Sequence, residues 1–307
     1  MTTGAPLVIL GPTASGKSDV AMELARRHSD AEVIAVDAMQ VYRRMDIGTA
    51  KPSTADRAAV VHHCIDLVDA ADEFTVADFA RAAQTALVGI AGRDHRAVLV
   101  AGTGLYLRSV TDPMEVPGRW PEVRAELDLR AGTEGSAALH RQLSDLDPAA
   151  AAKMEPSNVR RVVRALEVVI GSGRPFSSFG PGVDTYPEIA FVQVGLRWPR
   201  PLLAKRIEER VHRMIAAGFV AEVESLAAEP VSRTARQALG YKELFQYFDG
   251  ACTLDAAIET IIIRTRQFAV RQERWFRRDP RIRWIDIDDD PVATALPVLE
   301  RAWHTSS

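Results

Sequence analysis

Short apolar runs alternate with longer stretches of helical spacing over the first hundred residues. The runs at 7–10, 33–36 and 97–101 consist of Val, Ile, Leu and Ala, a composition typical of parallel strands buried on both faces. Between them, residues 17–28 and 75–90 predict helices. The alternation indicates strands joined by crossover helices, which bring the carboxyl ends of the strands together. We therefore expect ligands to gather directly after these three runs.

The pattern changes near residue 114, where a connector with Pro and Gly leads into helical spacing without strands. Further helices are predicted near 121–129, 136–143 and 158–170. A strand pattern resumes at 189–196. The sequence therefore predicts an α/β fold in two domains, a parallel-sheet core of residues 1–113 and 187–307 and a small all-helical insertion at 114–186.

The rest of the core is predicted to be mostly helical, with helices at 201–228, 240–248 and 254–278 and a last strand at 283–287. Eight arginines and two acidic residues stand between Arg264 and Arg283, a local balance of +6 in a chain whose total charge is −3. Such a stripe is typical of a surface that contacts nucleic acid, and a solvated helix face is the alternative. We assign its arginines to a nucleic-acid backbone and the interleaved Phe268, Trp275 and Phe276 to the core.

Composition excludes several classes of protein. With 47% hydrophobic and 26% charged residues in a chain of 307, neither a disordered tail nor a coiled coil fits. No apolar stretch approaches the roughly 20 residues of a membrane span, so no membrane partner is expected. The first residues lack a basic segment and a cleavage site, which predicts a cytoplasmic protein. Cys64 and Cys252 are too few for a zinc knuckle or a disulfide framework.

A glycine-rich loop follows the first strand directly and matches the pattern G-x-x-x-x-G-K-[ST] between a strand and a helix. Backbone amides and the helix dipole of such a loop bind phosphate oxygens, and its lysine adds a mobile charge. Its serine would hold a magnesium ion. The loop predicts a P-loop fold for the core. It does not identify the ligand, because a nucleoside triphosphate and a diphosphate ester would fit it equally. The loop reads Gly11, Pro12, Thr13, Ala14, Ser15, Gly16, Lys17, Ser18.

Of the two other predicted strands of the first hundred residues, one is followed by an acidic residue and the other is not. Asp37 ends the run at 33–36, whereas Gly102 and Thr103 follow the run at 97–101. A carboxylate at that place supports a metal ion or acts as a base toward substrate. Spacing alone leaves both roles open, and a helix cap is the alternative to either.

The block from Asp37 to Lys51, with Asp-x-x-Gln-x-Tyr followed by Ile-Gly-Thr-Ala-Lys, resembles the tRNA dimethylallyltransferase family, also called tRNA isopentenyltransferases. The similarity continues in family order from residue 8 to about 285. Two departures stand out, because Ala38 replaces a common Ser and Ala101 a common Gly. We expect activity to persist, since Asp37 and Gln40 remain. The further similar blocks lie at 62–66, 101–106, 158–167, 239–243 and 265–276.

The resemblance implies a reaction and a set of site residues. The P-loop would hold the diphosphate of dimethylallyl diphosphate, with Mg²⁺ on Ser18. Arg210 is the arginine assigned to the diphosphate, and its neighbour Arg206, one helical turn away, stays open as the other candidate. The dimethylallyl group would pass to N6 of the adenosine 3′-adjacent to the anticodon of UNN-reading tRNAs, releasing diphosphate. Asp37 would remove the proton and Thr103 would lie near the reacting phosphate oxygen. For both arginines, salt bridges to neighbouring Glu residues are the alternative.

The tRNA partner must present an extruded base, which costs a few kcal/mol of stacking. The insertion resembles the RNA-gripping segment of the family, and Arg160, Arg161 and Arg164 are predicted to share one helix face. The chain ends at Ser307 without the zinc-finger extension of eukaryotic relatives, which points to a bacterial type, and we expect a monomer. The residues implied to contact tRNA are Asp37, Ala38, Met39, Gln40, Thr103, Arg124, Arg160, Arg161 and Arg164.

Three other functions remain open at this point. An adenylate isopentenyltransferase of the cytokinin type would use a similar loop and acid, but a mononucleotide needs no basic insertion. An ATP-dependent small-molecule kinase would share the P-loop. A non-enzymatic RNA-binding protein with a relict loop is the third, and the intact Lys17, Ser18 and Asp37 argue against it.

Overall fold

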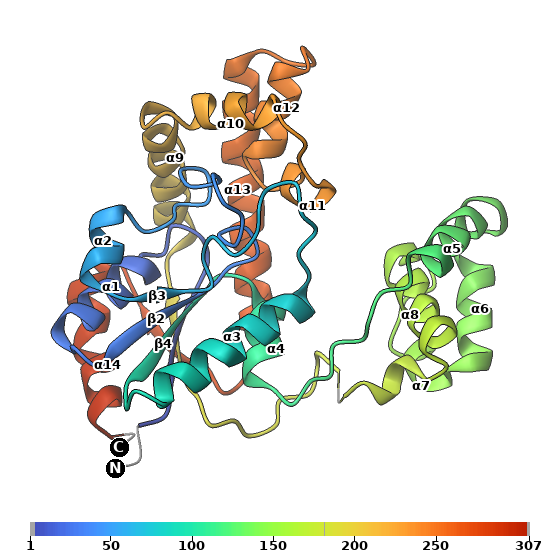
Figure 1. The fold of residues 1–307 in the computed structure, drawn as a ribbon, viewed down its shortest axis with the longest axis horizontal. Coiled ribbons are helices and arrows are strands. Elements are labelled where there is room, and N and C mark those ends of the chain that lie inside the picture. Colours follow the sequence, from blue (N-terminus) through green and yellow to red (C-terminus); the bar gives the residue numbers. More distant parts are fainter. Residues whose placement is uncertain (1–3, 181, 306–307) are drawn as a thin grey trace. The chain divides into compact units, whose positions relative to one another are not determined.

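The computed structural model describes residues 4–180 and 182–305 (Figure 1). Residues 1–3, part of the segment from which a cytoplasmic protein was predicted, lie outside this description. All six strands are parallel and form one sheet in the order β3-β2-β4-β1-β5-β6. The strands are β1 (Leu7–Leu10), β2 (Ala31–Val36), β3 (His62–His63), β4 (Arg96–Ala101), β5 (Val192–Arg197) and β6 (Arg283–Asp286).

The register of the central strands brings their carboxyl ends to one edge of the sheet. Leu10 of β1 pairs with Ala101 of β4, which pairs with Val36 of β2. The loops after all three strands therefore start side by side, as the sequence predicted. The predicted α/β class with a parallel sheet is confirmed. Strand β3 was missed, because two residues carry no periodic pattern.

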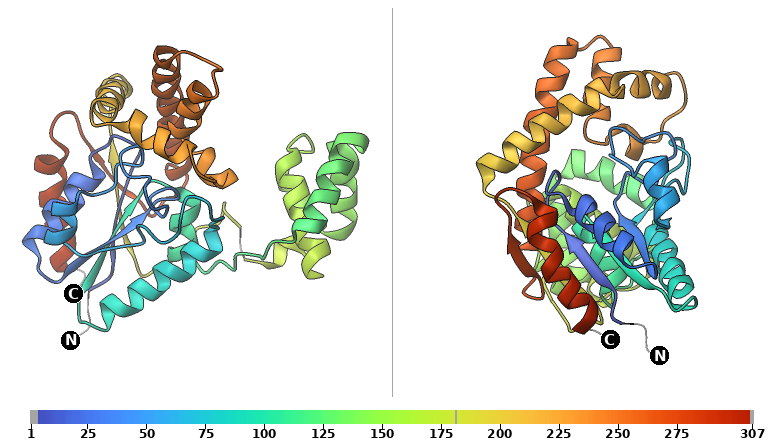
Figure 2. Two further views of the ribbon diagram at one scale, coloured as in Figure 1. Left: turned by 45° about the horizontal axis from the view of Figure 1, so that its top comes forward. Right: turned by 90° about the vertical axis from the view of Figure 1, so that its left-hand side faces the viewer.

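Helices cover both faces of the sheet because each central strand is apolar on both sides (Figure 2). Leu7 and Ile9 pack in one core cluster with α1 (Lys17–Arg27) and α14 (Pro291–Thr305). Val8 and Leu10 pack in another, which contains side chains of α3 (Val76–Ala91) and α4 (Gly104–Thr111). The period-2 alternation of a strand thus divides the core into two layers.

Further helices pack on the second cluster toward the carboxyl edge of the sheet. The single helix predicted at 201–228 is wrong, because Gly218 adopts a left-handed φ of 99° and divides it into α9 and α10. None of the described helices is both long and apolar enough to cross a membrane. The helices of the second cluster are α9 (Arg200–Ala216), α10 (Phe219–Ala227), α11 (Arg233–Arg236), α12 (Tyr241–Phe248) and α13 (Leu254–Phe276). The short helix α2 (Thr54–Ala59) buries no residue.

The chain divides into two compact units, Asp112–Pro187 and the remainder of the chain. The smaller unit has its own apolar core, to which Leu127, Leu143, Val162 and Leu166 contribute. No strand occurs among its described residues. Its helices are α5 (Pro121–Glu134), α6 (Ser136–Leu146), α7 (Pro148–Ala151), α8 (Val159–Ser172) and the 3₁₀ turn η1 (Phe176–Ser178).

Candidate active site

A cavity of about 1090 Å³ opens at the carboxyl edge of the sheet, within the larger unit. Its walls come from the loops after β1, β2 and β4 and from α9, α12 and α13. Most of the predicted core-unit site residues therefore meet in one place. Those that line the cavity are Thr13, Ala14, Gly16, Lys17, Ser18, Asp37, Ala38, Met39, Gln40, Thr103 and Arg210.

The loop after β1 has the curvature of a phosphate cradle. Ala14 and Gly16 both adopt left-handed φ values, 63° and 85°, which turn successive amides inward. A Cβ at Gly16 would lie 2.4 Å from Pro291 of α14, so only glycine fits there. The helix α1 begins at Lys17 and leaves its first amides without intrahelical acceptors. Gly11, Pro12 and Ser15 are buried and lie behind the cavity wall.

One amide of this loop is already committed, to a residue that the sequence did not single out. The amide of Thr13 donates to Oε1 of Gln272 at 2.8 Å, and Nε2 of Gln272 donates to the carbonyl of Gly102 at 2.7 Å. Gln272 is buried on α13. A single side chain thus ties the phosphate loop to the turn that carries Thr103. No local signal could have found it, because 259 residues separate Gln272 from Thr13.

Two cations face the cavity beside the loop. Burial, reinforced by the charge of Arg210, lowers the pKa of Lys17 to about 8. Arg210 is half-buried and makes no ion pair with any described residue. Arg206 instead donates to the carbonyl of Ala14 at 3.0 Å and lies over the ring of Trp198. Neither arginine therefore forms the salt bridges considered as an alternative, and Arg206 supports the loop.

Asp37 begins the loop after β2 and uses only one of its carboxylate oxygens there. Oδ1 accepts hydrogen bonds from the amides of Met39 at 2.7 Å and Gln40 at 3.2 Å. The helix cap considered as an alternative is not formed, because no helix begins here; Oδ1 instead closes a turn. No described residue bonds to Oδ2, so the second oxygen remains available to a substrate or an ion.

The orientation of Gln40 is fixed by two backbone carbonyls. Its Nε2 donates to Thr49 at 3.0 Å and to Ala50 at 3.3 Å, which commits both amide protons. The side chain of Gln40 therefore offers a ligand only an acceptor, Oε1. The amides of residues 46–48 in the same loop donate to Glu222 of α10, a second partner that the sequence did not reveal.

Thr103 stands directly before α4 and lines the cavity. Its carbonyl accepts the amide of Leu107 at 3.0 Å, as expected of a residue that starts a helix. Among the described residues its hydroxyl has no hydrogen-bond partner. Thr103 therefore starts the helix through its carbonyl, while its hydroxyl is available to the cavity.

The donor set of the cavity fits a hard divalent cation. The hydroxyl of Ser18, at the start of α1, and Oδ2 of Asp37 are oxygen ligands without partners among the described residues, and both residues line the cavity. Mg²⁺ prefers such oxygens together with water and phosphate.

Comparison with known proteins agrees with this geometry. A family model described as IPP transferase matches residues 40–279, and one described as isopentenyl transferase matches residues 6–64. The tRNA dimethylallyltransferase of Kineococcus radiotolerans is 48% identical over 96% of each chain, and that of Desulforudis audaxviator is 44% identical over 97% of this chain and 98% of its own. The chain belongs to the tRNA dimethylallyltransferase family.

Solved structures of the family have the same fold. The full-length tRNA isopentenylpyrophosphate transferase of Bacillus halodurans superposes with a TM-score of 0.71 at 35% identity, covering 99% of this chain and 98% of its own. A eukaryotic dimethylallyltransferase acting on tRNA gives 0.78 at 26% identity, covering 97% of this chain and 77% of its own. The P-loop fold predicted from the sequence is therefore that of the tRNA dimethylallyltransferases.

In this family member the four arginines of the smaller unit that were predicted to contact tRNA fall into two groups. Arg164 forms an ion pair with Glu167 at 2.8 Å and donates to the carbonyls of residues 117 and 118. Arg124 forms an ion pair with Asp128 at 2.9 Å and lies 3.7 Å from the same Glu167. Arg160 and Arg161 are exposed and make no ion pair with any described residue. The two groups differ in what they offer a partner, because only Arg160 and Arg161 have uncommitted charges.

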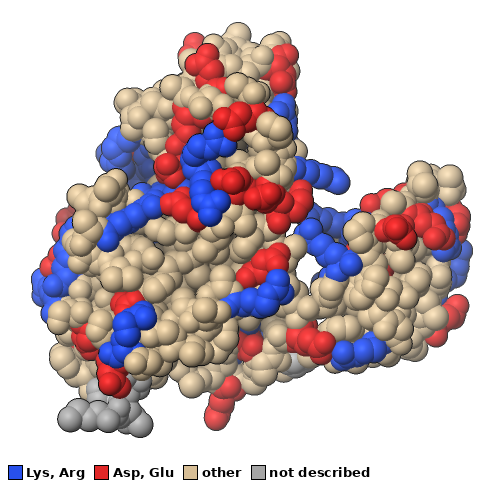
Figure 3. Space-filling model, in the orientation of Figure 1, with Lys and Arg blue, Asp and Glu red and all other residues tan. Residues whose placement is uncertain are grey.

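The basic stripe of this transferase carries more acidic partners than its local charge suggests. Arg264 pairs with Glu243 and Arg266 with Glu208. Figure 3 shows Asp and Glu side chains among the Lys and Arg side chains over α10 to α13. Of the aromatic residues assigned to the core, Phe276 is buried there, Trp275 packs partly buried against it, and Phe268 lines the cavity instead. The assignment of Phe268 was wrong because helical spacing does not distinguish a core face from a cavity face.

Proposed function

We propose that the protein transfers the dimethylallyl group of dimethylallyl diphosphate to N6 of the adenosine 3′-adjacent to the anticodon of UNN-reading tRNAs, with release of diphosphate. One observation carries the proposal. A single cavity holds an anion-binding loop, two cations, Lys17 and Arg210, that form no ion pair with any described residue, and Asp37, whose Oδ2 accepts no hydrogen bond from the described residues. The reaction requires these two opposite charges in one place.

The leaving group requires positive charge. When the allylic C–O bond breaks, an electron pair stays on the diphosphate, and groups already aimed at that oxygen stabilise the developing charge. Lys17, Arg210 and the amides at the start of α1 supply it. Ser18 would hold Mg²⁺, which would supply further positive charge beside the diphosphate oxygens. Thr103 donates its hydroxyl toward the same phosphate oxygen.

The acceptor requires a base. As N6 bonds to the allylic carbon, one of its protons passes to Oδ2 of Asp37, so that charge is balanced when diphosphate leaves. The other N6–H remains on the nitrogen and donates a hydrogen bond to Oε1 of Gln40, the side-chain atom of Gln40 that has no partner among the described residues. A nucleobase with a carbonyl oxygen at this position would instead face two acceptors, Oδ2 of Asp37 and Oε1 of Gln40, and would be repelled. The pair therefore selects an exocyclic amine, and Ala38 and Met39 complete the contact with the base.

The tRNA is gripped through phosphate contacts. Arg160 and Arg161 form no ion pair with any described residue, whereas contact by Arg164 requires an exchange of its pairing with Glu167, and contact by Arg124 an exchange of its pairing with Asp128. A single anticodon arm needs no symmetric partner, so the protein is proposed to act as a monomer, in the cytoplasm where tRNA is available.

Label transfer with matched acceptors tests the proposal. Radiolabelled dimethylallyl diphosphate is offered with an unmodified UNN-reading tRNA, with the same tRNA carrying guanosine at the target position, and with AMP. We expect label on the adenosine tRNA alone. Label on AMP would indicate an adenylate isopentenyltransferase. Absence of label, with phosphate transfer from ATP to a small molecule, would indicate a kinase.

A further inference from the structure

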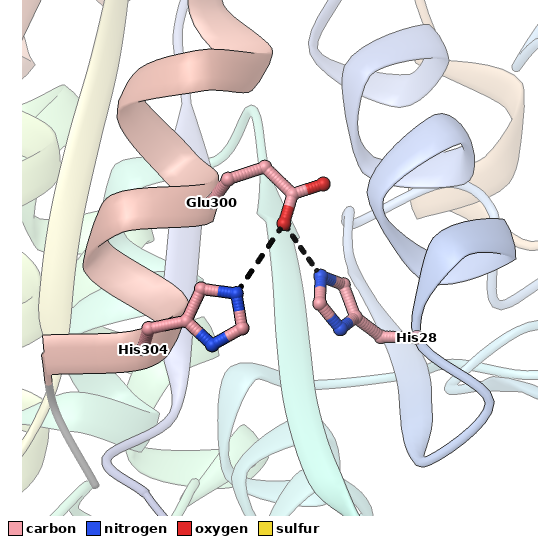
Figure 4. Close-up of side chains that lie close together, drawn as sticks. All are labelled: His28, Glu300 and His304. Carbon is pink, nitrogen blue, oxygen red and sulfur yellow. Dashed lines mark hydrogen bonds and ion pairs between the residues drawn. The ribbon is translucent and has the colours of Figure 1, made fainter.

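Two histidines and a glutamate converge far from the phosphate loop, at the opposite end of α1 (Figure 4). His28 is the residue directly after α1, and Glu300 and His304 lie one turn apart on α14. The two helices pack against each other on one face of the sheet. One nitrogen of each imidazole and one oxygen of the carboxylate all lie within 4.8 Å of one another.

Both imidazoles face the same carboxylate oxygen. Nε2 of His28 lies 2.8 Å from Oε2 of Glu300, and Nε2 of His304 lies 3.9 Å from it. The guanidinium of Arg27 lies 3.9 Å from the other oxygen, Oε1. Within the described residues, the imidazoles have no other hydrogen-bond or ion-pair partner. Three ligand atoms thus lie close together, and Arg27, which pairs with Glu23 at 2.9 Å, lies nearer to the carboxylate oxygen that the imidazoles do not face.

We propose that His28, Glu300 and His304 bind one transition-metal dication of the Zn²⁺ class, with water as the fourth ligand. Two imidazole nitrogens and a carboxylate oxygen are a ligand set that Zn²⁺ uses in four-coordinate sites. Mg²⁺ and Ca²⁺ require oxygen ligands, so they do not fit this set. The site is therefore separate in place and in chemistry from the oxygen donors beside the phosphate loop.

Of the three ligands, His304 must move to complete the site, and its side chain is the least constrained. Ligands of a tetrahedral zinc ion lie about 3.3 Å apart. His28 and Glu300 are already closer than this, and the ring of His28 is held by stacking on Trp303 at a centroid distance of 4.7 Å. His304 must approach; its side chain is 71% exposed and meets the ring of His28 edge-on at a centroid distance of 5.7 Å, so little packing opposes the change. The cation would lie at the carboxyl end of α1, where the helix dipole favours positive charge.

The consequence of binding follows from where α1 and α14 begin. Pro291, the first residue of α14, lies against Gly16 in the phosphate loop, and α1 begins directly after that glycine. A metal ion at His28 would join the same two helices at their other ends. Because the metal ion would bind the folded chain and not the unfolded chain, it would raise the free energy of unfolding.

Zinc titration of the tag-free full-length chain, stripped with EDTA, tests the site. Competition with a chromophoric chelator should show one Zn²⁺ per chain, and Mg²⁺ should not displace it. His28→Asn and His304→Ala should each weaken binding by at least about tenfold, the least that loss of a supporting residue costs a metal site. His212→Ala, which removes an exposed histidine of α9, is the matched control and should bind as the parent does.

Two further readouts separate this site from a hydrogen-bonded cluster without a metal. Co²⁺ should give the visible absorption of a four-coordinate site in the parent and not in His304→Ala. Zinc should raise the melting temperature of the parent and leave that of His304→Ala unchanged, while the two should melt alike in EDTA. No stoichiometric uptake, or uptake unchanged in both ligand variants, would overturn the proposal.

Discussion

Replacing Gln272 by leucine should impair the reaction without disturbing tRNA binding. The substitution leaves two partners unsatisfied, the amide of Thr13 and the carbonyl of Gly102. Each buried polar group left without a partner costs about 1–3 kcal/mol, or about 2–6 kcal/mol for both. Because Thr13 lines the cavity and water can reach its amide, we expect the lower part of this range.

Part of that loss should appear in the transition state, because Gln272 holds the phosphate loop and the Thr103 turn in one arrangement. A loss of about 1–2 kcal/mol lowers kcat roughly 5- to 30-fold. The assay is single-turnover transfer of the labelled dimethylallyl group, with tRNA affinity and the melting curve measured on the same samples. Gln84→Leu, at an exposed glutamine of α3, is the matched control.

Gln272→Glu distinguishes positioning from bulk packing. A protonated carboxyl can donate to Gly102 and accept from Thr13 as the amide does, whereas the ionised form has no proton to donate. The activity of this variant should therefore rise as pH falls, relative to the parent. If Gln272→Leu kept kcat and KM within about twofold of the parent, or if Gln272→Glu showed the parent's pH profile, the bridge would have no role in the reaction.

Three other perturbations follow from the same contacts. Because the pKa of Lys17 is lowered to about 8, its charge is lost as pH rises through 8. Diphosphate affinity, measured by calorimetry, should therefore be about tenfold lower at pH 9 than at pH 7. Lys17→Arg should make this affinity nearly independent of pH over the same range. Arg160→Ala with Arg161→Ala should lower the salt slope of tRNA binding by roughly 1.4–1.8, whereas Arg130→Ala should not, and an unchanged slope would place the RNA contact elsewhere. Gly48→Ala would put a Cβ 2.2 Å from the ring of Phe219 and should reduce the free energy of unfolding in urea by about 1–3 kcal/mol. An unchanged free energy of unfolding would show that the ring moves aside without cost.

Much of the core could be predicted because its signals are local. The continuous apolar runs at 7–10 and 97–101 correspond to β1 and β4 to within one residue. The phosphate-loop pattern is also local, since a strand, glycines at fixed spacing and a helix start are all consecutive in the chain. Asp37 became a candidate for the same reason, as the first residue after a buried strand.

Other elements carry no such signal. The amphipathic pattern of 201–228 continues through Gly218, so only the positive φ of that glycine reveals two helices. The helix α14, which contains Pro297 in its interior, was not expected at all. Propensity and periodicity are weak where tertiary packing decides the conformation.

The supporting residues of the site depend on contacts between distant segments. Glu222 holds the loop at 46–48, which lies 174 to 176 positions away along the chain, and Gln272 is still farther from Thr13. Neither Glu222 nor Gln272 belongs to a sequence motif from which its partner could be predicted. The same holds for Gln40, whose donors are fixed by carbonyls of Thr49 and Ala50. Sequence alone therefore named the groups proposed to react and not those that orient them.

The central claim is that one cavity holds the diphosphate with one set of residues and removes the N6 proton with another. Equilibrium binding of dimethylallyl diphosphate and the single-turnover transfer rate, measured on Asp37→Asn and Lys17→Met, separate the two. Asp37→Asn should bind the diphosphate within about threefold of the parent while transfer slows at least about 100-fold, the scale of a lost general base. Lys17→Met should lose diphosphate binding. Proportional loss of binding and transfer in Asp37→Asn would contradict the assignment of Asp37 as the base.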